Sequence, residues 1–228
     1  YKRQGHSMGG GSAMSFAARH RDCDAGAFAA VANHTGTVCV SNVWDVEPVV
    51  RPELELLFGG TPAEERFEYQ RSSTVDLDPN GALIPQGRHM ATNLAFVDTR
   101  TYYASNDTLT YLSTQSQSLT AFMQSLPFAL YEEIVVVAPS ECLNLPPGFP
   151  DGHCWESVDT ADLYDWFESK SLVEMPPFGR CLADRSGRWY GFDVFQEQPG
   201  AFSSFDFVAD RVRDLIEVTS MENVRGLN

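Results

Sequence analysis

The chain has 228 residues, 43% of them hydrophobic, and is therefore long enough to bury the core of one or two domains. Its 16 Lys and Arg against 31 Asp and Glu give a formal net charge of −15 and a pI near 4.6. This balance opposes binding to phosphate backbones and anionic lipid, so we expect no nucleic-acid partner. No run of about 18 apolar residues occurs, so we expect no membrane partner either.

The N-terminal third predicts a turn, a helix and a buried strand. Residues 5–19 have the glycines of a tight turn and then apolar side chains at helical spacing. The apolar run 27–32 predicts a buried parallel strand that ends at a loop over residues 33–36. Prolines and glycines punctuate residues 43–93, which we interpret as an insertion or lid.

Strands alternate with helices along the middle of the chain. Residues 101–104 are strand-like, and leucines at intervals of seven predict a helix over residues 112–126. The uncharged, β-branched run 134–138 predicts a central strand. Asp159 has the position of a cap before a helix with apolar residues over 163–167. This alternation predicts the α/β class with a parallel sheet.

The character of the chain changes after about residue 172. Residues 188–195 and 201–208 are aromatic-rich and strand-like. We therefore divide the chain into an α/β region over residues 1–172 and a β-rich appendage, cut short at its end, over residues 173–228.

Five cysteines are present, at positions 23, 39, 142, 154 and 181. None has C-x-x-C spacing, which favours disulfides over a zinc site. Cys23 with Cys39, and Cys142 with Cys154, would each close a short loop. Disulfides predict a secreted or periplasmic protein, although five cysteines also fit a reduced cytoplasmic enzyme.

Residues 5–9 read Gly-His-Ser-Met-Gly and match the pattern G-x-S-x-G. In this pattern a serine occupies a sharp, strained turn between a strand and a helix. The helix dipole would point at Ser7 and favour an oxyanion there, with the Met8 N–H as one donor. An ordinary glycine-rich turn is the alternative, but the helix predicted next and the strand about twenty residues later favour a nucleophile.

The run Gly-His-Ser-Met-Gly-Gly over residues 5–10 resembles the nucleophile elbow of the α/β-hydrolase superfamily, both its esterase and depolymerase branch and its prolyl-oligopeptidase-like peptidases. The resemblance covers residues 1–172 and implies a three-layer α/β sandwich with a β-rich C-terminal extension. The family has several strands before the elbow, whereas six residues precede Ser7 here. The resemblance therefore implies an incomplete sheet whose N-terminal strands are missing, and weak stability or activity of this piece alone.

The resemblance also implies the chain order serine, acid, histidine, each after a strand. Asp107 and His153 follow the two later predicted strands. In the implied roles His153 takes the proton of Ser7, while Asp107 orients the imidazole. A turn aspartate is the alternative for Asp107, with Asp98 as the rival acid. His34 is the rival base, although chain order argues against it.

Three further residues have positions where a substrate pocket would form: His6 beside the nucleophile, His34 after the first strand and Trp155 after His153. We expect them to bind substrate. The predicted reaction is cleavage of a small or polymeric carboxylic ester through an acyl-enzyme, with no metal and no organic cofactor. A prolyl-oligopeptidase-like peptidase and a non-catalytic hydrolase-like binding module stay open as alternatives, and the sequence does not indicate the oligomeric state.

Overall fold

The computed structural model describes residues 2–21, 28–138, 151–172 and 176–228. Its first part is built on a four-stranded sheet in the order β1-β2-β3-β4, in which every neighbouring pair is parallel. The strands are β1 (Lys2–His6), β2 (Ala30–His34), β3 (Asp98–Ala104) and β4 (Tyr131–Val136). The α/β class and the parallel sheet predicted from the sequence are confirmed.

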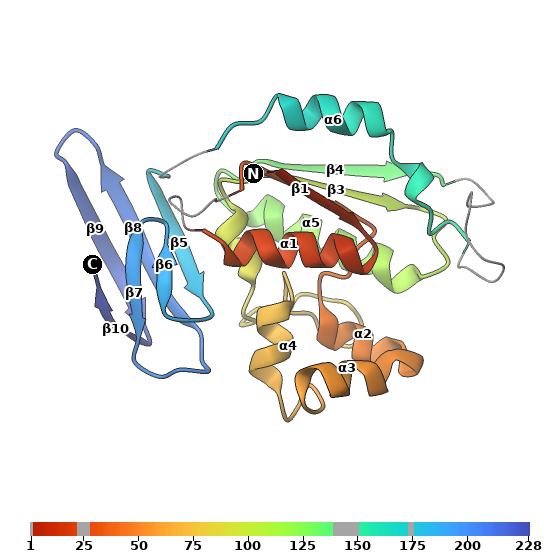
Figure 1. Ribbon diagram of the computed structural model, residues 1–228, viewed down its shortest axis with the longest axis horizontal. Helices are drawn as coiled ribbons and strands as arrows, with labels where there is room; N and C mark the ends of the chain where they lie inside the picture. Colours follow the sequence, from red (N-terminus) through yellow and green to blue (C-terminus); the bar gives the residue numbers. More distant parts are fainter. Residues whose placement is uncertain (1, 22–27, 139–150, 173–175) are drawn as a thin grey trace.

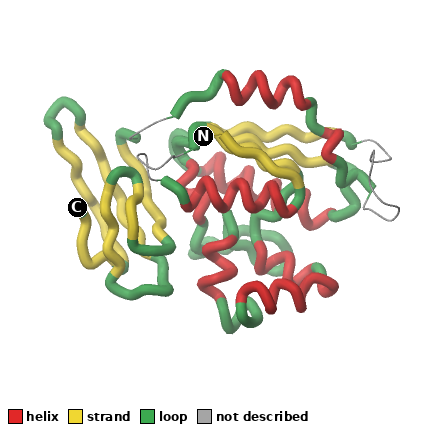
Figure 2. The backbone as a smooth tube through the Cα atoms, in the orientation of Figure 1, coloured by secondary structure: helices red, strands yellow, loops and turns green. Residues whose placement is uncertain are grey.

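Helices cover both faces of this sheet and make three layers (Figures 1 and 2). They are α1 (Met8–Arg19) and α5 (Thr110–Ser125) on one face and α6 (Thr160–Glu168) on the other. Val31 of β2 belongs to the same core cluster as Met14 and Leu119. Its neighbour Ala32 points the other way and packs with Trp166, as the alternation of side chains along a strand requires. No helix in the described ranges is long and apolar enough to cross a membrane.

The local helix signals were reliable, and the cap of α6 shows why. The side chain of Asp159 accepts hydrogen bonds from the N–H groups of Ala161 and Asp162 at 2.9 and 3.2 Å. These are two of the N–H groups that a helix start leaves without an intrahelical acceptor. Apolar residues at helical spacing then place Leu163 and Trp166 against the sheet.

The predictions for the first two strands of the sheet need correction. The first buried strand begins at Ala30 and continues through Asn33 and His34, which were expected to lie in a loop, and all its residues are buried. The polar residues before Ser7 lack the apolar character of a buried strand, yet residues 2–6 form β1, which pairs with only one neighbour among the described strands. Polar side chains are tolerated there because one flank and the outer residues stay exposed.

The run 134–138 was expected to be a central strand, and this is wrong. β4 covers Tyr131–Val136 and lies at the other edge of the described sheet. Val135 is 51% exposed and Val137, past the end of the strand, is 78% exposed. A β-branched, uncharged run indicates a strand but does not distinguish an edge from a centre.

The proline-rich and glycine-rich segment over residues 43–93 is mostly helical. It contains α2 (Val40–Val46), η1 (Pro48–Val50), α3 (Arg51–Phe58) and α4 (Arg66–Ser72), and it leads into η2 (Met90–Leu94). Pro48 and Pro52 stand in the first turns of η1 and α3, where the missing N–H is not needed. Gly59 ends α3 with a φ of 90°. Here proline and glycine mark helix boundaries.

The C-terminal strands form two antiparallel sheets, in the orders β10-β7-β6 and β5-β8-β9. They are β5 (Phe178–Ala183), β6 (Gly187–Trp189), β7 (Phe192–Gln196), β8 (Ser203–Asp210), β9 (Leu215–Glu222) and β10 (Val224–Leu227). Rings from the two sheets meet, with 5.1 Å between the centroids of Phe192 and Phe205. The expected strand over 188–195 is interrupted by a turn, because Tyr190 and Gly191 have φ values of 52° and 87°.

A buried aspartate joins these strands to the rest of the molecule. Asp184, at the end of β5, has a fully buried carboxylate whose Oδ2 accepts hydrogen bonds from Arg19 of α1 and Arg71 of α4 at 2.8 and 3.0 Å. Beside it, Asn93 bonds to Ala18 and to both backbone groups of Leu182. The core cluster accordingly runs without a break from α1 into the C-terminal strands.

Replacing Asp184 by Asn should therefore lower the free energy of unfolding. We expect a loss of about 2 to 4 kcal/mol, less than for a fully buried pair because both arginines retain some exposure. Urea unfolding with an unchanged slope would measure it. Asp193→Asn, at an exposed position of β7, is the matched control and should change stability little. Equal stability of the two variants would contradict the bridging role.

Candidate active site

The candidate residues gather where the parallel strands end. The carboxyl ends of parallel strands lie at one edge of the sheet, where ligands bind in open α/β sheets (Figure 1). Ser7 directly follows β1, and His34 is the last residue of β2. Asp107 follows β3, and His153 lies further along the chain after β4. All three of the predicted triad residues are thus carried by the same edge.

Ser7 has the strained backbone expected of a nucleophile elbow. Its φ of 55° and ψ of −130° lie in a region that a residue with a Cβ rarely adopts. The Ser7 N–H donates to the carbonyl oxygen of His34 at 2.9 Å, and the Ser7 carbonyl oxygen accepts from Gly10 N–H at 2.9 Å. The turn is therefore held from β2 and from α1. The Met8 N–H is the first amide of α1 and has no acceptor within the helix.

Glycines allow this turn to pack without side chains. A Cβ at Gly5 would overlap the carbonyl of Gly9, and a Cβ at Gly11 would overlap the carbonyl oxygen of Thr37. Gly9, in contrast, has nothing within 4 Å of a built Cβ. The start of α1 therefore lies directly against the strand before it and against the loop after β2.

Asp107 and His153 are hydrogen-bonded to each other. His153 Nδ1 lies 2.8 Å from Asp107 Oδ2, and the two side chains are 2% and 0% exposed. The other carboxylate oxygen of Asp107 accepts from Leu109 N–H at 2.8 Å, which fixes the carboxylate plane. A neutral imidazole that donates from Nδ1 presents a basic Nε2.

The loops that carry these two residues are joined through their backbones. The N–H and the hydroxyl of Thr108 both donate to the carbonyl oxygen of Asp151, at 3.0 and 3.1 Å. Gly152 has a φ of 76°, and a Cβ there would overlap the backbone of Asn106. Neither Thr108 nor Gly152 was predicted from the sequence, although the Asp-Gly pair before His153 is a turn signal.

The rival residues are placed elsewhere or bonded otherwise. Asp98 begins β3, at the far end of the strand from Asp107, and forms an ion pair with Lys170 at 3.0 Å. His34 is buried, and its Nε2 lies 2.7 Å from Ser157 Oγ. Neither residue occupies the position of a triad acid or base.

Three imidazoles and an indole pack together at the edge of the sheet. The ring centroid of His6 lies 4.6 Å from that of His34 and 4.7 Å from that of His153. Trp155 meets His6 edge-on at 6.1 Å and His34 at 5.5 Å. The three residues expected to bind substrate are thus brought together beside His153.

Two of these histidines are held in the neutral form. Burial, and then the nearby His153, lower the pKa of His6 to about 4. Burial, followed by His6 and His153, lowers the pKa of His34 to about 3. The physical reason is that a second cation beside His153 would be poorly solvated and repelled.

The cysteines need one correction. Cys39 is a buried free thiol at the start of α2, so the suggested pairing of Cys23 with Cys39 is wrong. Its sulfur lies 3.2 Å from Ser41 Oγ, and burial raises its pKa. Cys154, next to His153, is disulfide-bonded. Cys23 and Cys142 lie outside the described residues.

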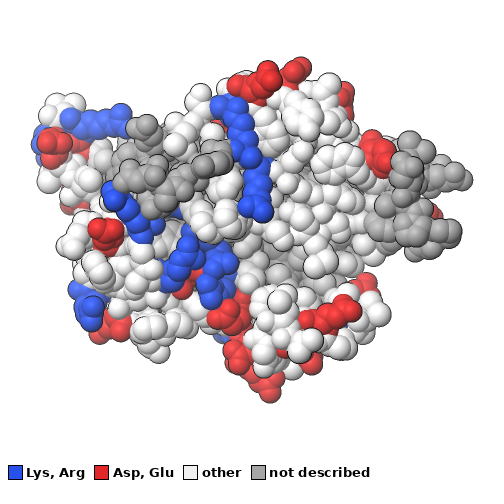
Figure 3. Space-filling model, viewed as in Figure 1, with Lys and Arg blue, Asp and Glu red and all other residues white. Residues whose placement is uncertain are grey.

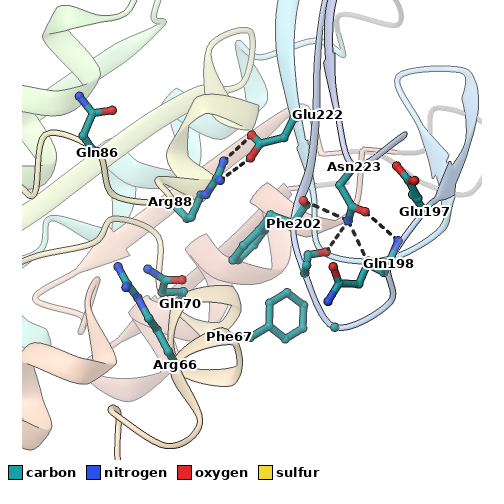
Figure 4. A pocket seen from close by; sticks show the side chains of 12 residues that line it. Arg66, Phe67, Gln70, Gln86, Arg88, Glu197, Gln198, Phe202, Glu222 and Asn223 are labelled. Carbon is teal, nitrogen blue, oxygen red and sulfur yellow. Dashed lines mark hydrogen bonds and ion pairs between the residues drawn. The ribbon is translucent and has the colours of Figure 1, made fainter. Parts of the chain in front are cut away.

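A cavity of about 840 Å³ lies between α4 and the C-terminal strands, away from these residues (Figure 4). Its walls include Arg66 and Phe67 of α4, Phe202 before β8, and the ion pair of Arg88 with Glu222 at 2.7 Å. None of the predicted catalytic or substrate-binding residues lines it. This cavity is therefore separate from the candidate residues at the carboxyl edge of the parallel sheet.

Charged side chains are unevenly distributed over the face shown in Figure 3. Acidic side chains gather over α6 and around α3 and α4, whereas basic ones gather between α1 and the C-terminal strands. Arg19 of α1 and Arg71 of α4, which reach the buried Asp184, are among the basic residues that join α1 and α4 to the C-terminal strands.

No protein-family model matches the sequence, and no curated protein matches it either. Among solved structures, a similar chain is that of a PHB depolymerase variant in complex with an R3HB trimer, with a TM-score of 0.36 and 10% sequence identity. The match covers 92% of this chain and 63% of the depolymerase chain, so this chain spans less than two thirds of the depolymerase's length. At this TM-score the similarity does not establish a shared fold.

The glycines of the elbow give a first prediction for this site. Gly11→Ala should lower the free energy of unfolding by about 1 to 3 kcal/mol, because its methyl group would meet the Thr37 carbonyl. Gly9→Ala should raise it by about 0.5 to 1 kcal/mol, because the added methyl group meets nothing and alanine favours the helix. Chemical denaturation of both variants tests the packing, and equal effects would contradict it.

The histidine stack gives a second prediction. In a proton NMR titration, His6 should have its midpoint near 4 and His34 near 3. Unfolded histidine titrates near 6.5, so the unfolded state binds more protons between these values and 6.5. The free energy of unfolding should therefore rise with pH in this window, and the part that depends on the neutral His6 and His34 should be lost as pH falls through it. His6→Gln should reduce that slope, and a midpoint of His6 at 6.5 would disprove the burial argument.

Proposed function

We propose that the chain is an α/β-hydrolase that cleaves carboxylic esters through Ser7, His153 and Asp107. The observation that carries the proposal is the buried hydrogen bond between His153 and Asp107 at the sheet edge where Ser7 adopts its strained turn. Serine, acid and histidine come after β1, β3 and β4, in the chain order of this superfamily.

In the proposed reaction the Ser7 hydroxyl oxygen attacks the ester carbonyl, and His153 Nε2 takes the hydroxyl proton. The imidazolium that forms is stabilised by Asp107, which accepts a hydrogen bond from Nδ1 and is not itself protonated. The proton then passes from Nε2 to the leaving alcohol, and an acyl-enzyme remains on Ser7. Water then attacks the acyl-enzyme carbonyl while His153 takes its proton, and the carboxylic acid leaves as that proton passes to the Ser7 oxygen.

The developing oxyanion faces the start of α1 in this proposal. The Met8 N–H is the proposed donor, and the dipole of α1 favours negative charge at that position. Neutral His6 and Trp155 form the proposed wall of the substrate site, and the buried, neutral His34 packs against both. Because both imidazoles are neutral, the wall has little charge and suits an uncharged ester, small or polymeric.

A secreted or periplasmic location is part of the proposal. Its support is the disulfide at Cys154, since disulfides persist in oxidising compartments and are rare in the cytosol. The bond also lies next to the proposed base and would constrain the segment that carries it.

Fluorophosphonate labelling tests the proposed triad, because the reagent traps activated serines. The wild-type chain should be labelled, and Ser7→Ala and His153→Ala should not. Asp107→Asn should reduce the rate of labelling and of ester turnover by about 10⁴-fold, since the imidazole would lose the partner that fixes its tautomer. Mass spectrometry of the labelled peptide identifies the modified residue.

Asp98→Asn is the matched control for Asp107→Asn and should leave labelling unchanged, because Asp98 pairs with Lys170 at the other end of β3. Wild-type protein that is not labelled and turns over no ester would refute the catalytic proposal in favour of the binding module. Turnover of a proline-containing amide but of no ester would identify a peptidase instead.

A further inference from the structure

The segment that follows His153 is attached to the end of β2 by consecutive hydrogen bonds. His34 Nε2 lies 2.7 Å from Ser157 Oγ, and Ser157 Oγ donates to the carbonyl oxygen of Cys154 at 2.8 Å. The Ser157 N–H bonds to the same carbonyl oxygen at 3.4 Å. These contacts fix η3 (Trp155–Ser157), although His34 and Ser157 are 123 residues apart.

The direction of these bonds follows from the number of protons available. Ser157 has one hydroxyl proton and gives it to Cys154, so His34 must donate to Ser157 from Nε2. His34 is then the neutral tautomer with a lone pair on Nδ1. That nitrogen is buried and has no hydrogen-bond partner among the described residues, which a lone pair tolerates better than an N–H group.

His34 is held rigidly enough to act as an anchor. It is 3% exposed, and it ends β2, which pairs with strands on both sides. Its ring lies among those of His6, Trp155 and Tyr102. Its carbonyl oxygen accepts the N–H of Ser7 at 2.9 Å. One residue therefore holds the proposed nucleophile by its backbone and the segment of the proposed base by its side chain.

The other end of the same segment is also fixed. Asp151 is held by Thr108, and Asp107 holds the ring of His153. With Ser157 held by His34, residues 151–157 are fixed at both ends. Loss of the His34 contact would leave the ring bonded to Asp107 and Cys154 in its disulfide, but it would release the segment at Ser157.

We propose that His34 is a positioning residue, which through Ser157 holds the backbone after His153 so that the imidazole stays aligned with both Asp107 and Ser7. This inference rests on the proposed function, and it gives His34 a role different from the substrate contact expected from the sequence. The role is geometric, because a shift of about 1 Å in a catalytic group lowers rates by up to about a hundredfold.

A pair of substitutions at His34 separates this role from simple packing. The amide nitrogen of glutamine reaches the position of Nε2, whereas that of asparagine reaches only the position of Nδ1. His34→Asn should therefore lower kcat for an ester by at least about tenfold with KM nearly unchanged, and His34→Gln should recover most of the lost rate. Equal loss in both variants would overturn the proposal.

Ser157→Ala tests the other half of the contact. It should lower kcat as His34→Asn does, and the double variant should lose no more than the more impaired single variant, because both remove one contact. Ser169→Ala is the matched control, since Ser169 Oγ donates to the carbonyl of Trp166 three residues earlier at 2.7 Å. It should leave kcat unchanged. Additive losses, or an equal loss in Ser169→Ala, would overturn the proposal.

A spectroscopic measurement distinguishes failure of this inference from failure of the proposed function. The proton between His153 Nδ1 and Asp107 should give a low-field NMR resonance that broadens in His34→Asn and Ser157→Ala but not in His34→Gln or Ser169→Ala. Ser157→Ala makes the smallest change and keeps the test valid if His34→Asn does not fold. If the variants show this pattern of broadening but the wild type is not labelled at Ser7, the proposed function fails and the positioning role stands. An unchanged resonance and unchanged kcat in Ser157→Ala would overturn the positioning role.

Discussion

The hydrogen bond between His153 and Asp107 exists because β3 and β4 are parallel neighbours. Parallel pairing sends the chain out of both strands at the same edge, so the segments that follow them meet there. The meeting is close because Gly152, with no Cβ and a left-handed φ, passes directly against the backbone of Asn106. An acid and an imidazole 46 residues apart thereby form a contact that is almost fully removed from water.

Exclusion of water then determines the charge of the neighbouring imidazoles. In a poorly solvated site, a carboxylate and an imidazolium attract each other strongly, and a second cation is correspondingly unfavourable. Asp107 is hydrogen-bonded to His153, whereas the pKa values of His6 and His34 are lowered to about 4 and about 3. His6 and His34 therefore stay neutral to pH values well below the ordinary histidine pKa of about 6.5.

The sequence predicted those parts of the fold that depend on local signals. Asp159 and the apolar residues after it predicted α6, and the glycine-rich turn at residues 5–11 predicted α1. Partners distant in sequence were not predictable. Nothing local distinguishes an edge strand such as β4 from a central one, and the polar strand β1 is recognisable only through its pairing with β2.

The same division holds for the candidate site. Ser7 was chosen by its motif, while the choice of Asp107 and His153 used chain order, a property of the fold as a whole. Ser157 and Thr108 were missed because a serine or threonine in a loop has no distinctive local pattern. Cys39 shows the same limit. Loop length alone suggested a disulfide to Cys39, whereas the residue is a buried free thiol at the start of α2.

Chain order alone made His34 a poor candidate for the base, yet its position gives it contacts to the segments of both Ser7 and His153. As the last residue of β2, it lies between the strand that leads to Ser7 and the strand that leads to Asp107. Its carbonyl oxygen holds the strained turn, and its Nε2 holds the segment after His153. A strained turn keeps its geometry only when its surroundings fix it, and here that support comes from a residue with ladder partners on both sides. The second strand of the sheet thus links the segments that carry the proposed nucleophile and the proposed base.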